Sequence, residues 1–432
     1  MGDGPRVLRP DREQLYWDKV DLESQIEGDH LARVIWAFVE GLDLSELYGS
    51  IRSRDDVAGR PRADPRVLLA VWLYATSEGI GSARALERLC RNHAAYRWLC
   101  GGVPVNYHGL SDFRRAHGDL LDRILTESVA SLAAAGLIDL DEVAVDGTKV
   151  GANASKSSFR DEGGLEGFAQ AARQRIERLR FEVDDDPGSS ERRRRAARER
   201  AARTVTERAA AAGRKLAELR KEKTRRKRTH PQEEAEKAES RASTSDPDAR
   251  MMLTRSGFRP AYNLLLSATT RSQIILGLRV SDRRNDTGIA QPMMENLRQR
   301  YGYMPKRLLI DTKAATRQDI VALADDPTDP VTTYTPPPPD KPSASLQSIR
   351  KRLRRRSREP VVIQEWRRRM ASLDGRVVYN RRRHIETINA QIKNRGLHRF
   401  ILRGIENVRC EALLHAIAHN LRRAASLGFA WA

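Results

Sequence analysis

The sequence predicts an α/β protein in which an all-helical unit precedes a mixed-sheet unit that carries a basic helical insertion. Helical spacing of apolar residues, with capping signals, dominates the first third of the chain. Short apolar segments of β type then alternate with helical segments. A long Arg-, Glu- and Ala-rich tract with few large apolar side chains separates the first strand from the others. We place the helical unit at residues 1–135, the sheet unit at 136–432 and the insertion at 164–245.

The composition favours a polyanion as partner. The 432 residues include 78 Lys and Arg against 58 Asp and Glu, a formal net charge of +20. Nucleic acid is the first candidate and an anionic membrane surface the second, but the longest apolar run, residues 67–75, is about half of what a membrane span requires. The N-terminal segment lacks the apolar stretch of a secretory signal, so we expect a cytosolic protein. Isolated cysteines offer neither a zinc site nor a disulfide framework: Cys90, Cys100 and Cys410.

Two predicted helices of the first unit resemble a helix-turn-helix. Asp64 is a candidate N-cap, Pro65 occupies the first helical position, and Gly79 follows the end of that helix. A second helix is expected after the cap Ser82, across a tight turn that contains glycine. Any pair of antiparallel helices would give the same pattern, so DNA recognition by this pair stays open. A third helix is expected to begin at Ser111 and to run to the end of the unit.

The predicted sheet begins with a strand that carries Val143 and Val145 on one face, and Gly147 and Gly151 are interpreted as turns beyond it. After the insertion, residues 262–282 predict a hairpin of two strands. The remaining elements alternate as helix, strand, helix, strand and helix, at residues 287–302, 305–313, 316–326, 331–342 and 411–427. A mixed sheet can adopt this order, which is similar to the ribonuclease H-like arrangement with an insertion after the first strand.

Two interpretations fit the basic insertion. The insertion is either a solvated helical hairpin or partly disordered arm, or an element that grips DNA. A second tract lies at residues 348–360. We expect the Arg runs near Arg192 and Arg354 to add affinity for phosphate without recognising bases.

Residues 379–397 predict one helix with a polar stripe. At 100° per residue, four side chains fall within about 60° of one another: Tyr379, Arg382, Glu386 and Lys393. Three apolar side chains gather about 120° away and would seat the helix on a core: Ile385, Ile388 and Ile392. An ordinary surface helix with an Arg382–Glu386 pair is the alternative.

Two aspartates, Asp146 and Asp311, each end a predicted apolar strand, where clefts form in α/β sheets. With Glu386 they predict a shared site for Mg²⁺, which prefers oxygen ligands. Two such ions about 4 Å apart can activate a water or a 3′-hydroxyl and stabilise the leaving oxygen at phosphorus. A second constellation, Glu411 with His415 and His419, has i,i+4 spacing that could bind a transition metal, but we favour polar positions on the last helix.

The residues Tyr379, Arg382, Glu386 and Lys393 reproduce the Tyr-x2-Arg-x3-Glu-x6-Lys signature of bacterial insertion-sequence DDE transposases. Residues 143–155 and 308–323 resemble the first and second catalytic blocks of that family. Three further segments resemble parts of that family. Residues 9–90 resemble its N-terminal helical domain, residues 244–252 the segment that precedes its second strand, and residues 394–423 its C-terminal helices.

The resemblance implies a catalytic, metal-binding triad of Asp146, Asp311 and Glu386 that uses Mg²⁺ or Mn²⁺ as two ions. It implies contacts with the transposon end from Tyr379, Arg382 and Lys393. The implied partners are double-stranded transposon ends and target DNA, bound by a homo-oligomer in the bacterial nucleoid. The implied activity is cleavage at terminal inverted repeats and transfer of the freed 3′ end. Residues 1–135 would be a DNA-binding domain and 136–432 the catalytic domain.

The chain departs from the family after Asp311. Relatives carry a glycine-rich turn with an aromatic residue, whereas Thr312, Lys313 and Ala314 stand here. Glycine would permit a positive φ, so the departure is compatible with a catalytically decayed or domesticated DNA-binding protein. A third possibility, an RNA-binding protein, predicts aromatic stacking platforms that the 6% aromatic content does not favour.

Overall fold

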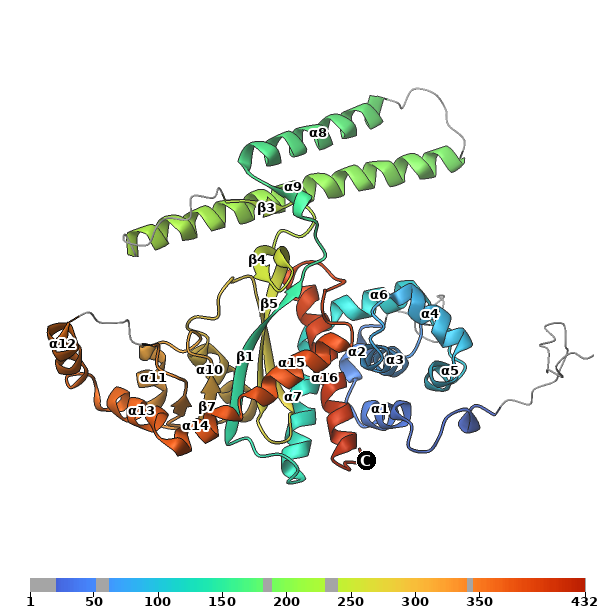
Figure 1. Cartoon of the computed structure of the whole chain (residues 1–432). Helices are drawn as coiled ribbons and strands as arrows, with labels where there is room; N and C mark the ends of the chain where they lie inside the picture. The colour runs from blue at the N-terminus through green and yellow to red at the C-terminus, as the bar shows by residue number, and fades with distance from the viewer. Residues whose placement is uncertain (1–20, 52–61, 182–188, 230–239, 340–344, 432) are drawn as a thin grey trace, which may run out of the picture.

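The computed structural model describes residues 21–51, 62–181, 189–229, 240–339 and 345–431. A central sheet lies between the N-terminal helices and a group of later helices, and a long helical pair, α8 and α9, projects beyond it (Figure 1). The three cysteines are free and buried. Within the described ranges no helix is both long and apolar enough to cross a bilayer.

The N-terminal helices only partly follow the prediction. Asp64 caps α3 by accepting a hydrogen bond from the Arg66 N–H at 2.7 Å, and Ser82 caps α4. The predicted third helix is wrong, because Asn106 caps an earlier helix and the chain breaks at His117. The helices are α1 Leu31–Glu40, α2 Ser45–Gly49, α3 Pro65–Ser77, α4 Ala83–Asn92, α5 Ala94–Cys100, α6 Tyr107–Ala116 and α7 Gly118–Ala134. Short 3-10 helices lie at Glu23–Gln25 and Lys156–Ser158.

The central sheet is mixed and six-stranded. Strand β5 has β1 on one side and β4 and β6 on the other, all antiparallel to it, and β7 and β8 continue beyond β1 in parallel. Each predicted strand is present, and β4 is an addition. The strands are β1 Glu142–Gly151, β4 Arg250–Thr254, β5 Gly257–Thr269, β6 Ile275–Ser281, β7 Arg307–Ile310 and β8 Thr332–Tyr334.

Both faces of the sheet are covered, because side chains alternate between two cores. Ala144 and Leu309 join a core with the N-terminal helices and the helices α15 and α16. Val143 and Leu308 join a second core with α7 and α10. The first core runs unbroken from the N-terminal helices to the sheet, and the division at residue 135 stays a prediction. The covering helices are α10 Ala290–Tyr301, α11 Arg317–Ala324, α13 Val361–Ala371, α14 Leu373–Asn380, α15 Arg383–Asn394 and α16 Ile405–Ser426.

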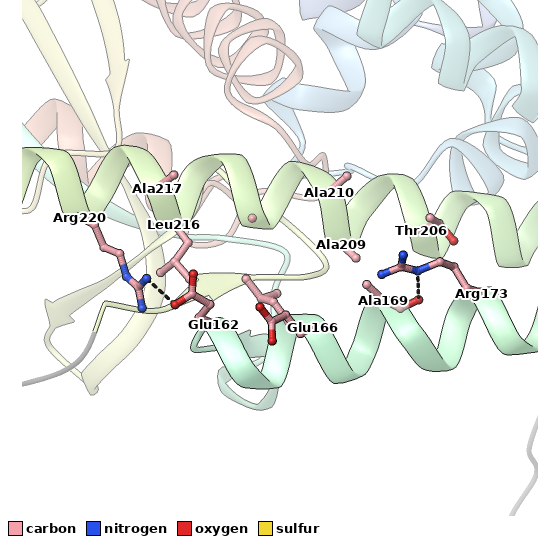
Figure 2. A pocket seen from close by; sticks show the side chains of 12 residues that line it. Glu162, Glu166, Ala169, Arg173, Thr206, Ala209, Ala210, Leu216, Ala217 and Arg220 are labelled. Atoms are coloured by element: carbon pink, nitrogen blue, oxygen red, sulfur yellow. Dashed lines mark hydrogen bonds and ion pairs between the residues drawn. The ribbon is translucent and has the colours of Figure 1, made fainter.

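The insertion forms a helical hairpin, and whether this hairpin grips DNA stays a prediction. Its helices are α8 Glu162–Phe181 and α9 Ser189–Thr229, and β2 Phe159–Arg160 pairs with β3 Ala242–Ser243 at its base. A small apolar cluster closes this base: Leu165, Ala212, Leu216 and Ala242. A groove of about 620 Å³ lies between the two helices. An ion pair of 2.6 Å between Arg220 and Glu162 borders it, and Figure 2 shows the side chains that line it. The second basic tract forms α12 Leu346–Arg356, which buries no residue.

Candidate active site

The register of the parallel strands brings two predicted acids to one place. Val145 of β1 pairs with Ile310 of β7, and this is the last pair between the two strands. Asp146 and Asp311 are each the next residue. Neighbouring strands lie about 4.8 Å apart, so the two aspartates follow adjacent positions at the same edge of the parallel pair.

Strand β1 is longer than predicted, so Asp146 lies in its middle and not at its end. Gly147 and Gly151 are strand residues that pair with β5, and the interpretation of these glycines as turns is wrong. A glycine within a strand often marks a close approach of another group. The side chain of Asp286 fills this place beside Gly147.

Asp146 is held from two sides by α15 and the turn before it. Its Oδ2 accepts a hydrogen bond from Asn389 Nδ2 at 2.9 Å, and its Oδ1 lies 3.2 Å from the Arg382 guanidinium. Burial raises the pKa of Asp146 to about 6, and the charges of Glu386 and Asp286 add to this effect while Arg382 opposes it. The carboxylate is therefore largely removed from solvent, and its strongest charged neighbour is the Arg382 guanidinium.

The predicted single helix at residues 379–397 is in fact two helices. Helix α14 ends at Asn380 and α15 begins at Arg383. The N–H groups of Arg381 and Arg382 donate to carbonyls three residues back, at 3.1 and 2.9 Å, which tightens the chain into a turn between the helices. Tyr379 thus belongs to α14. The predicted apolar side of α15 is confirmed, since its three isoleucines are buried: Ile385, Ile388 and Ile392.

The Arg382 guanidinium lies among all three predicted acids. It pairs with Asp146 and with Glu386, its neighbour one turn along the chain. Burial disfavours its charge, but the surrounding charges of Asp146, Tyr379, Glu386 and Asp311 outweigh burial and raise its pKa. Glu386 and Asp311 are exposed, whereas Arg382 is largely buried. Arg382 therefore pairs with two of the three predicted acids, and the charge of Asp311 contributes to raising its pKa.

The donor set fits a hard divalent cation in its chemistry. It consists of carboxylate oxygens, which Mg²⁺ and Mn²⁺ prefer. Burial is the main cause of the raised pKa of Asp146, and a bound cation would favour the ionised carboxylate that burial disfavours. No trio of His, Cys, Asp or Glu side chains in the described part of the chain is arranged to hold a metal ion, and the Arg382 guanidinium bridges two of the acids.

The other two members of the predicted stripe flank this cluster. Lys393 donates a hydrogen bond to Thr148 Oγ1, two residues beyond Asp146 on the same face of β1. Burial lowers the pKa of Lys393, and the charge of Arg255 adds to this effect. Burial also raises the pKa of Tyr379. Both side chains are half-buried.

Two stretches of the chain match families of known proteins. Residues 20–116 match the family described as "Transposase domain (DUF772)". Residues 346–425 match the family described as "Transposase DDE domain", and this stretch includes the turn and helix α15 that carry Arg382, Glu386 and Lys393. Both descriptions name transposases, which is consistent with the insertion-sequence DDE transposases that the sequence resembles. No curated protein and no solved structure matches it.

The turn after Asp311 forms in this chain without a glycine. The Ala314 N–H donates to the Asp311 carbonyl at 3.0 Å. Among the described residues other than glycine, a positive φ occurs at Gln273 and not in this turn. The residues that replace the glycine-rich turn therefore adopt ordinary backbone conformations.

Sequence reasoning missed two side chains of the site. Asn389 lies three residues after Glu386, one helical turn along, and that spacing was the available signal. Asp286 lies in the loop between β6 and α10, far from the other acids in the chain, and no local pattern marks it.

Glu411 and His419, two members of the second candidate metal constellation, form hydrogen bonds with the backbone. Glu411 accepts from the N–H groups of Ile401 and Leu402 at 3.0 Å. His419 donates from Nε2 to the Gln273 carbonyl at 2.9 Å. The favoured interpretation, polar positions on the last helix, agrees with these contacts.

Proposed function

We propose that this protein is a DNA transposase that cuts DNA at terminal inverted repeats and transfers the freed 3′ ends to target DNA. Asp146, Asp311 and Glu386 form its triad in this proposal. The main support is that Asp146 and Asp311 directly follow the register partners Val145 and Ile310, while the helix of Glu386 lies against β1.

We infer a ribonuclease H-like core for the sheet unit. The order β6-β5-β1-β7-β8 supports this, because the first three strands are antiparallel and the last two are parallel to β1. Such an order places the acids at the centre of the sheet. Residues 1–135 are the DNA-binding domain in this proposal, and residues 164–245 are a basic insertion in the catalytic domain at 136–432.

Two divalent ions, Mg²⁺ or Mn²⁺, would supply activation of the attacking oxygen and stabilisation of the leaving oxygen. The oxygen atoms of Asp146, Asp311 and Glu386 would hold them. Asn389 orients Asp146 through its hydrogen bond. With the acids neutralised in this way, the Arg382 guanidinium would be available for a phosphate of the transposon end.

The DNA contacts beyond the triad come from residues around the acids. Lys393 and Tyr379 flank the cluster and would contact the transposon end. The basic helices α9 and α12 add phosphate affinity along the flanking duplex. The active form in this proposal is a homo-oligomer assembled on paired ends, in the nucleoid.

The test is cleavage of duplexes made from the DNA that flanks the gene, with Mg²⁺ present. Glu386→Gln should keep end binding nearly intact and abolish cleavage, because glutamine keeps the shape of the side chain and an acceptor for Arg382 but removes the charge of the proposed ligand. Glu365→Gln, an exposed glutamate of α13, is the matched control and should cleave like the unaltered protein. Strong cleavage by Glu386→Gln would remove this residue from the triad.

The same experiment tests the alternative that the protein binds DNA but has lost its catalytic activity. That alternative predicts that the unaltered protein binds the duplex ends and never cuts them. The ordinary backbone conformation of the turn after Asp311 weakens this alternative. Affinity for structured RNA, compared with affinity for duplex ends at matched salt, tests the RNA-binding alternative.

A further inference from the structure

A fourth acid, Asp286, packs against the strand that carries Asp146. Its Oδ1 accepts hydrogen bonds from Lys149 Nζ at 3.1 Å and from Asn263 Nδ2. A Cβ added at Gly147 would lie 2.7, 2.8 and 2.9 Å from the Asp286 Oδ2, Cγ and Oδ1 atoms. Any larger residue at position 147 would therefore displace this carboxylate.

The loop of Asp286 is also bound to the turn that follows Asp311. The N–H groups of Gly288 and Ile289 donate to the Ala314 carbonyl at 3.0 and 3.2 Å. The Ala314 N–H in turn donates to the Asp311 carbonyl at 3.0 Å. Residues 286–289 thus connect β1, which carries Asp146, to the turn that follows Asp311.

The loop at residues 286–289 connects these segments at the point where the hydrogen bonds between β1 and β7 end. The backbone ladder between β1 and β7 ends at the pair Val145 and Ile310, one residue before the two aspartates. Beyond that pair, the loop bearing Asp286 supplies hydrogen bonds that bridge the two segments. Its charge also lies close enough to Asp146 to favour a cation there.

We propose that Asp286 is a positioning residue that fixes the segments of Asp146 and Asp311 relative to each other, so that both can contribute to a site for a divalent cation. This inference rests on the proposed function, since it takes both aspartates as metal ligands. Asp286 acts through Gly147 and Lys149 on one side and through its own loop on the other. Outer partners of this kind set metal affinity by orienting the ligands.

Asp282 offers a matched control on the same loop. It pairs with Lys215 at 2.9 Å and with Arg250 at 3.5 Å, and its side chain is 26% exposed against 28% for Asp286. Both acids therefore make polar contacts at similar exposure. Only Asp286 packs on Gly147.

The first experiment measures Mn²⁺ binding by electron paramagnetic resonance in the complex with flanking-DNA duplex, together with urea unfolding. Asp286→Asn should weaken Mn²⁺ binding by about 10-fold or more, a usual effect of losing an outer partner. Asp282→Asn should bind Mn²⁺ like the unaltered protein. Equal Mn²⁺ affinities of the two variants would overturn the positioning role. Absence of Mn²⁺ binding by the unaltered protein would instead overturn the proposed function.

The second experiment uses the space beside Gly147. Gly147→Ala should weaken Mn²⁺ binding as Asp286→Asn does, because the new Cβ displaces the carboxylate. In an Asp286→Ala background the same Gly147→Ala change should cause no further loss. Additive losses would show that Gly147 acts independently of Asp286, and would overturn the proposal even if each variant is less stable than the unaltered protein.

Discussion

The Arg382 guanidinium lies 3.2 Å from the Asp146 carboxylate, with side-chain exposures of 15% and 20%. It also pairs with Glu386. Without metal, Arg382→Gln leaves both carboxylates without this cation and should lower the free energy of unfolding by about 1–3 kcal/mol, the usual penalty for a polar group that loses its partner. Urea unfolding in EDTA measures this loss.

Added Mn²⁺ should narrow the difference in stability between Arg382→Gln and the unaltered protein, because the ion neutralises the same carboxylates. Arg381→Gln is the control, since Arg381 pairs with Glu142 at 2.9 Å and not with the proposed triad. Its loss of stability should not depend on Mn²⁺. A gap for Arg382→Gln that stays constant on adding Mn²⁺ would contradict metal binding at these acids.

Lys393→Ala should weaken binding of flanking-DNA duplex and flatten its salt dependence. Each phosphate contact that is lost reduces the slope of log K against log salt by about 0.9. Lys306→Ala is the comparison, because Lys306 lies at the amino end of β7 beside Asp141, at the opposite edge from the acids. Fluorescence anisotropy at several salt concentrations gives both slopes, and equal slopes would place Lys393 outside the DNA contact.

Local signals in the sequence predicted much of the fold. Asp64 caps α3 because its side chain reaches an N–H two residues on, a contact set by adjacent residues. The isoleucines of α15 are buried because their spacing matches the helical turn. Such features depend on a few neighbouring residues, so the sequence alone reveals them.

Features that depend on distant residues were not predicted. Gly147 was interpreted as a turn, but it is a strand residue whose missing side chain makes room for Asp286. The break before Arg383 separates Tyr379 from the helix of Glu386, and the helical wheel gave no sign of it. Both errors concern the site, where long-range contacts override the local pattern.

His419 should make the protein less stable in mild acid. Burial lowers its pKa to about 4, with the charges of Arg395 and Arg423 adding to the effect and the Gln273 carbonyl opposing it. Its Nδ1 is buried with no hydrogen-bond partner among the described residues. Because the folded pKa lies below the unfolded value of 6.5, this stability is complete above pH 6.5 and is lost as the pH falls towards 4.

The loss from this one residue should reach about 3 kcal/mol, at about 1.4 kcal/mol per pKa unit. His419→Gln cannot take up the proton, so its unfolding free energy should change less between pH 6.5 and 4. His398→Gln, at an exposed position, should keep the dependence of the unaltered protein. Urea unfolding at several pH values between 4 and 6.5 measures these free energies. If the unfolding free energy depends on pH in the same way for all three proteins, His419 is not the titrating group.

Two glycines with positive φ meet where the N-terminal helices contact α15. Gly79, with φ 76°, follows α3, and Gly396, with φ 94°, follows α15. A Cβ at Gly396 would lie 3.1 Å from the Gly79 carbonyl oxygen. An alanine at position 396 therefore meets two penalties, the left-handed conformation and a clash with backbone that cannot rotate away.

Gly428→Ala separates these penalties, because Gly428 has φ 77° and its added Cβ would meet nothing within 4 Å. It should cost about 1–2 kcal/mol, from the left-handed conformation alone. Gly396→Ala should cost about 1–3 kcal/mol more, the range for overpacking. Unfolding free energies from urea titration give the difference directly. Equal costs would mean that the contact between the end of α15 and the turn after α3 adjusts freely, so that the helix of Glu386 is not fixed by the N-terminal helices.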